Sequence, residues 1–142
     1  MPTSKASAEW NGGLKGGTGR YQAGSGGFSG SYTFASRFEG TGGTNPEELI
    51  AAAHAACLSM ALSGGLEKAG HPATSIKTTA QCTIEKVGDG FKITKMQLEV
   101  RGTVPGIDQA AFQQAAEGAK NGCPVSGALK GNVEMTLDAK LE

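Results

Sequence analysis

The sequence has few charges, no excess of either sign, and no apolar run long enough to cross a membrane. Thirteen Lys and Arg balance thirteen Asp and Glu among 142 residues, which argues against nucleic-acid binding because that requires surplus cations. The N-terminus lacks the apolar stretch of a secretory leader. The apolar segment 49–62 is shorter than the roughly 20 residues of a membrane span. We therefore expect a soluble, cytoplasmic protein.

Aromatic residues and cysteines are also scarce. With 38% hydrophobic and 6% aromatic residues, we expect one domain over residues 1–142 with a thin interior, which an oligomer could share. The three cysteines, Cys57, Cys82 and Cys123, include no C-x-x-C pair. Their odd number and the absence of a leader disfavour a structural disulfide framework. Each thiol is therefore either an inert core group or a reactive one.

Glycine, in contrast, is abundant: there are 23, and most of the first 43 residues are organised around glycine pairs. Three segments between them, at 6–10, 19–23 and 31–38, contain aromatic residues or threonine, which favour strands. A disordered low-complexity arm is the alternative. Because the aromatic residues recur at strand spacing, we predict three short antiparallel strands joined by glycine turns.

The strongest helix signal lies in the middle of the chain. Asn45 is suited to cap a helix, Pro46 to its first position, and Glu48 follows the cap by three residues, as in a capping box. The body, residues 49–62, is apolar nearly all round, which predicts a helix enclosed on most sides. Gly70 marks its end.

The second half of the chain predicts a hairpin, a helix and a last strand. Apolar and polar residues alternate over 74–87 and again over 91–100, and a change of face near 95–96 suggests a bulge. Asp108 caps a helix through Lys120, and alternation returns over 133–139. This order predicts an α+β fold with antiparallel sheets around a long central helix.

The cysteines differ in local context. Cys57 lies about three turns into its helix, beyond the reach of the helix dipole, and burial would raise its pKa. It is a core residue unless the fold brings a cation to it. Cys123 precedes Pro124 at the start of a short helix, where backbone amides favour a thiolate, although an unreactive capping residue is equally open. Cys82 lies on the apolar face of a strand and is expected to be inert.

His54 precedes Cys57 by one helical turn and shares its face. The pair is open to three interpretations. A Cys/His hydrolase would use His54 as its base but needs a third, orienting group. A zinc site could use His54, Cys57, Cys123 and His71, although the spacing is poor. The commonest alternative is a buried histidine that is hydrogen-bonded within a helical interface.

The stretch from Arg37 onward resembles the OsmC/Ohr family, and more narrowly its OsmC branch, the osmotically inducible protein C peroxidases. The resemblance covers the chain from about residue 37 to its end. It is carried by Arg37-Phe38-Glu39-Gly40, by the run from Gly43 to Leu62 that contains Asn45-Pro46-Glu47-Glu48 and His54-Ala55-Ala56-Cys57, and by the later stretches 104–108 and 121–126.

This resemblance implies an intertwined homodimer that acts in osmotic and oxidative stress as a peroxiredoxin-type peroxidase on organic hydroperoxides, without metal or cofactor. Cys57 would be the peroxidatic cysteine and Cys123 the resolving one. Arg37 would activate Cys57 and Glu47 would hold Arg37. Arg20 is the alternative arginine, since the Ohr branch takes its arginine from an early loop. An external dithiol, typically a lipoyl group in the family, would reduce the resulting disulfide.

Simple electrostatics supports the role of an arginine. A guanidinium about 4 Å from the sulfur at an effective dielectric near 20 contributes about 4 kcal/mol, or about three pKa units. Along one straight helix, however, Glu47 and Cys57 are about 15 Å apart. Either the chain leaves that axis, or a second subunit packs its helix antiparallel and brings its Glu47 near the first subunit's Cys57. The apolar helix and the thin core favour the second option.

Apolar side chains near the sulfur would favour organic peroxides over hydrogen peroxide, and Phe38, Leu58 and Met60 are the candidates. Two other functions stay open at this stage. One is a non-catalytic stress protein that binds a lipophilic ligand, and the other is the Cys/His hydrolase.

Overall fold

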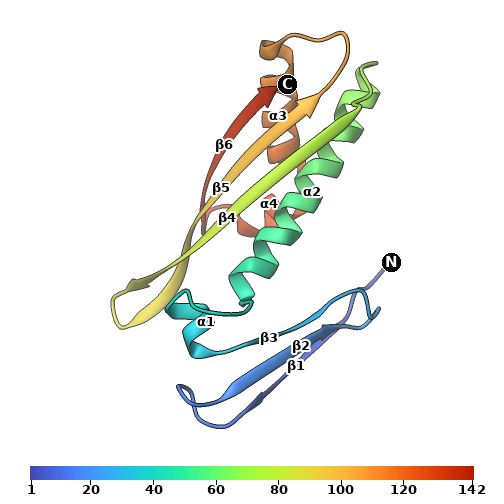
Figure 1. Cartoon of the computed structure of the whole chain (residues 1–142). Helices are drawn as coiled ribbons and strands as arrows, with labels where there is room; N and C mark the ends of the chain where they lie inside the picture. Colours follow the sequence, from blue (N-terminus) through green and yellow to red (C-terminus); the bar gives the residue numbers. More distant parts are fainter. The chain divides into compact units, whose positions relative to one another are not determined.

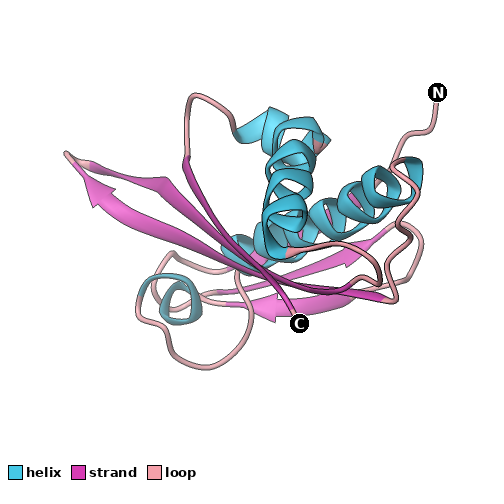
Figure 2. Ribbon diagram, turned by 90° about the horizontal axis from the view of Figure 1, so that it is seen from above, coloured by secondary structure: helices cyan, strands magenta, loops and turns pink.

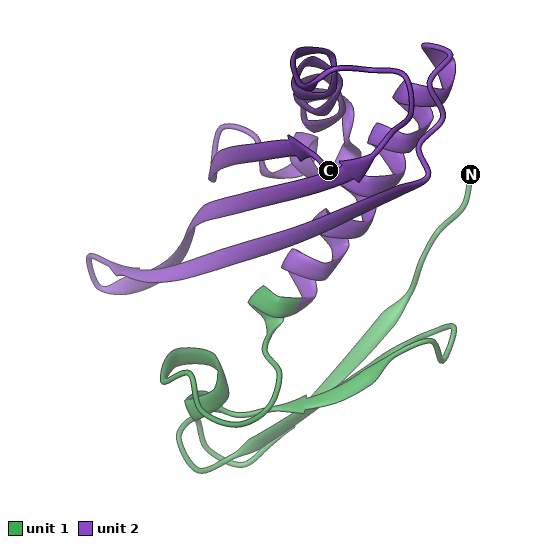
Figure 3. Ribbon diagram, turned by 45° about the horizontal axis from the view of Figure 1, so that its top comes forward, with its two compact units in different colours: residues 1–48 green, residues 49–142 purple.

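A computed structural model describes all residues from 1 to 142. The elements follow the order β1 (Ala6–Asn11), β2 (Thr18–Ala23), β3 (Ser29–Tyr32), α1 (Phe34–Phe38), α2 (Pro46–Lys68), β4 (Ser75–Val87), β5 (Gly90–Thr103), α3 (Gln109–Gly122), α4 (Pro124–Leu129) and β6 (Glu134–Leu141) (Figure 1). The chain forms two compact units, Met1–Glu48 and Leu49–Glu142 (Figure 3). The α+β class is confirmed, and the expectation of one domain over 1–142 stays a prediction.

The first unit contains a three-stranded antiparallel sheet in the order β1-β2-β3, as the glycine-punctuated sequence predicts. Trp10 on β1 and Tyr32 on β3 pack with ring centroids 5.4 Å apart. They meet over Gly19 of β2, where a Cβ atom would collide with both rings. The absence of a side chain at this position therefore lets two aromatic residues pack across the middle strand.

The predicted third strand, 31–38, is wrong from residue 33 onward. The strand ends at Tyr32, and Phe34–Phe38 form α1. Thr33 caps this helix: its hydroxyl accepts a hydrogen bond from the amide of Ser36, and the Ser36 hydroxyl accepts one from the amide of Thr33. This reciprocal capping outweighs the strand preference of the aromatic residues.

The second unit packs helices on one face of a three-stranded sheet in the order β4-β5-β6 (Figure 2). The β4–β5 hairpin is antiparallel, and its register shifts between Thr83 and Ile84, close to the predicted bulge. The core lies between helices and sheet. Its buried residues include Leu58, Leu62 and Leu66 from α2, Met96, Leu98 and Val100 from β5, and Phe112 and Ala116 from α3.

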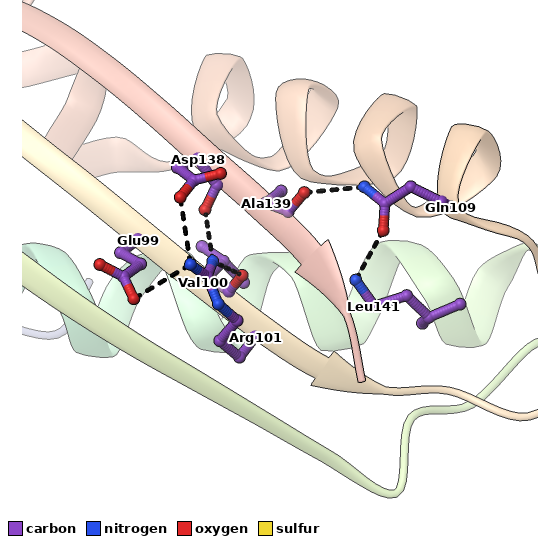
Figure 4. Close-up of polar contacts among 7 residues, drawn as sticks. All are labelled: Glu99, Val100, Arg101, Gln109, Asp138, Ala139 and Leu141. Atoms are coloured by element: carbon purple, nitrogen blue, oxygen red, sulfur yellow. Dashed lines mark hydrogen bonds and ion pairs between the residues drawn. The ribbon is translucent and has the colours of Figure 1, made fainter.

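One feature of this sheet corrects the sequence prediction: β6 runs parallel to β5, so the sheet is mixed rather than antiparallel. The reason is the connection, because α3 and α4 lie between the two strands and a long crossover returns the chain in the same direction. Gln109 of α3 fixes β6 from its other side. Its side chain donates to the Ala139 carbonyl at 2.8 Å and accepts from the Leu141 amide at 2.7 Å (Figure 4).

Helix α2 is continuous but is not enclosed within this chain. One stripe, formed by His54, Leu58, Leu62 and Leu66, is buried. The opposite apolar side is exposed, and Met60 retains 78% of its accessible surface. By length and composition α2 could cross a membrane, yet core helices of soluble proteins pass the same test. The predicted enclosure is thus not provided by the chain's own residues.

Candidate active site

The centre of the candidate site is a pair of reduced cysteines in the second unit. Cys57 lies on α2, and Cys123 is the residue between α3 and α4, where it ends one helix and begins the next. Their sulfur atoms are 2.7 Å apart. Cys57 is partly exposed and Cys123 is 1% exposed. A reagent from solvent can therefore reach the Cys57 sulfur, whereas the Cys123 sulfur is buried next to it.

Local structure explains why Cys123 reaches this position. The Cys123 amide donates to the Ala119 carbonyl at 2.8 Å, which completes the last turn of α3. Pro124 then takes the first position of α4, where its missing amide hydrogen costs nothing. Two helix ends thus fix the Cys123 backbone. The predicted placement of Cys123 at the start of a short helix is confirmed.

Within the single chain, the pKa values of the two thiols are shifted in opposite directions. Burial raises the pKa of Cys57, and its hydrogen bond to Cys123 raises it further, despite an amide bond from Val125. Burial also acts to raise the pKa of Cys123, but hydrogen bonds from Cys57, from Ser126 and from the Val125 amide together lower it. The accessible sulfur is thus the less acidic one, so nucleophilic chemistry at Cys57 requires a further positive group.

Arg37 and Glu47 form an ion pair in the first unit. Arg37 lies in the last turn of α1 and Glu47 in the first turn of α2. The intervening loop folds back because the Ser36 hydroxyl donates to the Thr44 carbonyl at 2.8 Å and the Asn45 amide donates to the Ser36 carbonyl at 3.1 Å. These two hydrogen bonds bring the start of α2 close to the end of α1.

The ion pair between Arg37 and Glu47 leaves some hydrogen-bonding groups of both side chains without a partner. Arg37 Nε and Nη2 both donate to Glu47 Oε1, at 3.1 and 2.9 Å. Glu47 is 4% exposed, and its Oε2 atom is buried without a partner. The Arg37 side chain remains 35% exposed. A carboxylate thus orients a guanidinium that can still bind another anion. Arg20, the alternative arginine, lies exposed on β2.

The remaining predicted residues fall into two groups. Phe38 lies beside Arg37, whose Cζ is 5.2 Å from the centre of the ring, and Met60 is exposed on α2. Leu58, in contrast, has no exposed surface and belongs to the core, which corrects its assignment as a substrate contact. Cys82 is partly buried and packs against the same core, as expected for a core cysteine.

His54 does not pair with Cys57. It is fully buried, and its Nε2 atom lies 2.7 Å from the Ser126 hydroxyl. Sequence reasoning missed Ser126, whose only signal was its place three residues after Cys123. No group of three or more His, Cys, Asp or Glu side chains could hold a metal ion. The zinc alternative therefore lacks a ligand set, and the hydrolase alternative lacks its Cys–His hydrogen bond.

This chain is similar to known proteins of one family. A family model described as OsmC-like protein matches residues 38–138. Peroxiredoxin OsmC of Escherichia coli (strain K12) is 51% identical over 139 residues, 97% of this chain and 96% of that protein. The organic hydroperoxide resistance protein of Xanthomonas axonopodis pv. citri (strain 306) is 36% identical over 104 residues, 69% and 68% of the two chains. The crystal structure of OhrB of Bacillus subtilis, an organic hydroperoxide resistance protein, superposes with a TM-score of 0.78 at 30% identity, over 97% of this chain and 98% of that one. The chain therefore belongs to the OsmC-like protein family.

Proposed function

We propose that this protein is a cysteine-based peroxidase that reduces organic hydroperoxides to alcohols. The observation that carries the proposal is the sulfur pair, with Cys57 accessible and Cys123 buried 2.7 Å away. One sulfur is thus placed to meet a peroxide, and the other to capture the oxidised product. The names of two similar proteins, a peroxiredoxin and an organic hydroperoxide resistance protein, support this chemistry.

The reaction proceeds in three balanced steps. The Cys57 thiolate attacks the distal oxygen of ROOH, the O–O bond breaks, and the alkoxide takes a proton to leave as ROH, which yields a sulfenic acid. Cys123 then attacks the Cys57 sulfur, expelling the hydroxyl as water and forming a disulfide. An external dithiol finally reduces this disulfide by two exchanges and is itself oxidised to a disulfide. A lipoyl group is a dithiol of this class.

Activation of Cys57 falls to Arg37. Its permanent charge would offset the burial that raises the Cys57 pKa, and Glu47 fixes its orientation. Glu47 and Cys57 both lie on the uninterrupted helix α2, ten residues and about 15 Å apart along its axis. An arginine bound to Glu47 can therefore approach the Cys57 of a second subunit, whose α2 packs antiparallel, more readily than the Cys57 of its own chain.

A homodimer is supported independently by the surface of α2. Its exposed side carries a groove of about 690 Å³ between α2 and α3, lined largely by Ala and Gly residues together with Met60. An apolar helix left uncovered would be costly in water, and small residues let another helix approach closely. A second copy of α2 on this face would supply the enclosure that the sequence predicts. We infer that the working enzyme is a soluble, cytoplasmic dimer.

The substrate class follows from the apolar surroundings. Met60 lies one helical turn from Cys57 and shares its face, and Phe38 lies against Arg37. An alkyl or aryl group would remove apolar surface from water on these side chains, whereas hydrogen peroxide has no such group. Discrimination in favour of organic hydroperoxides is therefore expected.

Intact-mass analysis after one equivalent of cumene hydroperoxide tests the proposal. The expected product has lost two hydrogen atoms, and peptide mapping should join Cys57 to Cys123. Cys123→Ser should stop at a sulfenic acid on Cys57, whereas Cys57→Ser should not react. An unchanged mass of the unmodified protein would reject the peroxidase and favour a ligand-binding protein. Ester cleavage lost in His54→Ala would instead indicate a hydrolase.

A further inference from the structure

The buried pair His54 and Ser126 has no part in the cycle described above. His54 has no exposed surface, and burial lowers its pKa, so its imidazole is neutral near pH 7. Its Nε2 atom contacts the Ser126 hydroxyl at 2.7 Å, which links α2 to α4. Its Nδ1 atom is buried without a partner. Burying a polar ring in this way is costly, so the contact with Ser126 calls for an explanation.

Ser126 lies close in the chain to Cys123, whose sulfur reacts in the proposed cycle. It is 3% exposed and lies in the first turn of α4, three residues after Cys123. Its hydroxyl and its backbone amide both act to lower the pKa of the Cys123 thiol. His54 contacts Ser126 and Cys57 contacts Cys123, each at 2.7 Å, and Ser126 lies three residues after Cys123 in the first turn of α4, all within one compact unit.

The direction of these hydrogen bonds follows from proton counting. A serine hydroxyl has one proton to donate and can accept as well. If His54 carries its proton on Nε2, it donates to Ser126, and Ser126 can donate its own proton to Cys123. The other tautomer would bury an unpartnered Nδ1–H and direct the serine proton to the imidazole. We assign the proton to Nε2, which leaves Nδ1 as a bare lone pair.

We propose that Ser126, oriented by His54, is the hydrogen-bond donor that stabilises Cys123 as a thiolate and thereby speeds closure of the Cys57–Cys123 disulfide. The inference rests on the proposed function, in which Cys123 attacks the Cys57 sulfenic acid. In that step the S–S bond forms, the S–O bond breaks, and the departing hydroxide takes a proton to become water. In this proposal Ser126 donates directly to the attacking sulfur, whereas His54 is a positioning residue.

The proposal assigns the two oxidative steps to different parts of the molecule. Arg37 is expected to act on the attack of Cys57 on the peroxide. The donor at Ser126 acts on the attack of Cys123 on the sulfenic acid. Removing Ser126 does not slow the first step, because an anion at Cys123 opposes an anion at Cys57.

Rapid-quench oxidation with cumene hydroperoxide separates these steps. The loss of the free Cys57 thiol reports the first step, and the appearance of the Cys57–Cys123 disulfide by intact mass reports the second. Ser126→Ala should slow disulfide closure about tenfold or more, the usual effect of removing one hydrogen bond to a charged group. Dimedone should then trap more sulfenic acid. Ser126→Thr, which keeps the hydroxyl, should restore closure, and Ser7→Ala at an exposed position of β1 should match the unmodified protein.

Variants at His54 provide a second test of the proposal. His54→Ala should slow closure less than Ser126→Ala does, and His54→Gln, whose amide can donate to Ser126, should recover part of the rate. In a Cys57→Ser background, the ultraviolet absorbance of the thiolate should titrate at higher pH once Ser126 is replaced by Ala. The unchanged Cys82 contributes equally to both curves. The titratable groups that the structure brings to Cys123 are Cys57 and, through Ser126, His54.

The outcomes distinguish the two proposals. If the unmodified protein does not oxidise Cys57, the proposed function fails. If it oxidises and closes normally but Ser126→Ala closes at the same rate and titrates at the same pH, the function stands and the role of Ser126 is rejected. Circular dichroism on each variant shows that the fold is retained. If Ser126→Ala does not fold, the comparison between His54→Ala and His54→Gln decides, because equal rates for those two would also reject the proposal.

Discussion

The two compact units differ in what they prepare for the reaction. Residues 1–48 hold a charged pair, Arg37 and Glu47, at the end of a glycine-rich sheet with little core of its own. Residues 49–142 hold two sulfur atoms within a well-packed helix and sheet layer. In the sulfur unit, burial raises the pKa of the accessible thiol. In the proposed mechanism, each unit therefore organises one half of the chemistry.

This division shows why neither half is reactive alone. The sulfur unit supplies proximity, which lowers the entropic cost of disulfide closure. It does not supply the charge that would make Cys57 a thiolate at neutral pH. The other unit supplies a guanidinium fixed by a buried carboxylate, whose permanent charge is independent of pH.

The largest expected effect comes from removing the cation. In Arg37→Met, burial and the hydrogen bond to Cys123 leave the Cys57 pKa above its ordinary value. The rate constant for cumene hydroperoxide should therefore fall by up to about a thousandfold at pH 7. It should rise about tenfold per pH unit as the medium becomes more alkaline, whereas the unmodified protein should level off near neutral pH. Stopped-flow oxidation across the pH range measures both.

Two controls sharpen this test. Arg37→Lys keeps the charge but loses the planar fork, so its rate should fall between those of the unmodified protein and Arg37→Met. Arg20→Met removes an exposed arginine on β2 and should change little. If Arg20→Met lost the activity and Arg37→Met kept it, the arginine would be misassigned.

A smaller effect is expected from separating the proposed subunits. Met60→Glu places a charge on the exposed apolar side of α2, where a second copy would have to bury it without a partner. Sedimentation should then show more monomer at a given concentration, and peroxidase activity should fall with the dimer fraction. Gln81→Glu adds the same charge at an exposed polar position and should alter neither. A fully active monomer would contradict the role of a second copy.

The sequence predicted those parts of the fold that depend on local signals. Asn45 caps α2 and Asp108 caps α3, as their positions indicated. The direction of β6 was missed because periodicity gives the face of a strand and not its pairing. Helix α1 was missed because two hydroxyl groups, on Thr33 and Ser36, outweighed its aromatic content.

The candidate site was predictable where a sequence motif marked its residues, and not where a residue's position depends on contacts distant in sequence. The resemblance named Arg37, Glu47, Cys57 and Cys123, and the structure places them as two close pairs, one in each unit. Ser126 was not predicted because its role depends on a contact with His54 across 72 positions of sequence. Leu58 was misassigned because spacing from Cys57 alone does not show which side of a nearly all-apolar helix faces the core.

The smallest predicted effect concerns the stability of the sulfur unit. The pKa of His54 is lowered by burial from its ordinary 6.5, so below about pH 6.5 the unfolded chain binds a proton that the folded chain excludes. Folding stability should therefore decrease as the pH falls through 6.5 toward the lower folded-state pKa, by at most about 1.4 kcal/mol per pH unit for this one group. His54→Gln cannot titrate and should show a shallower decline. Urea unfolding at several pH values on either side of 6.5 measures the difference. Parallel curves would show that protonation of His54 does not destabilise the fold, and that the unit holding the sulfur atoms tolerates a charge at its centre.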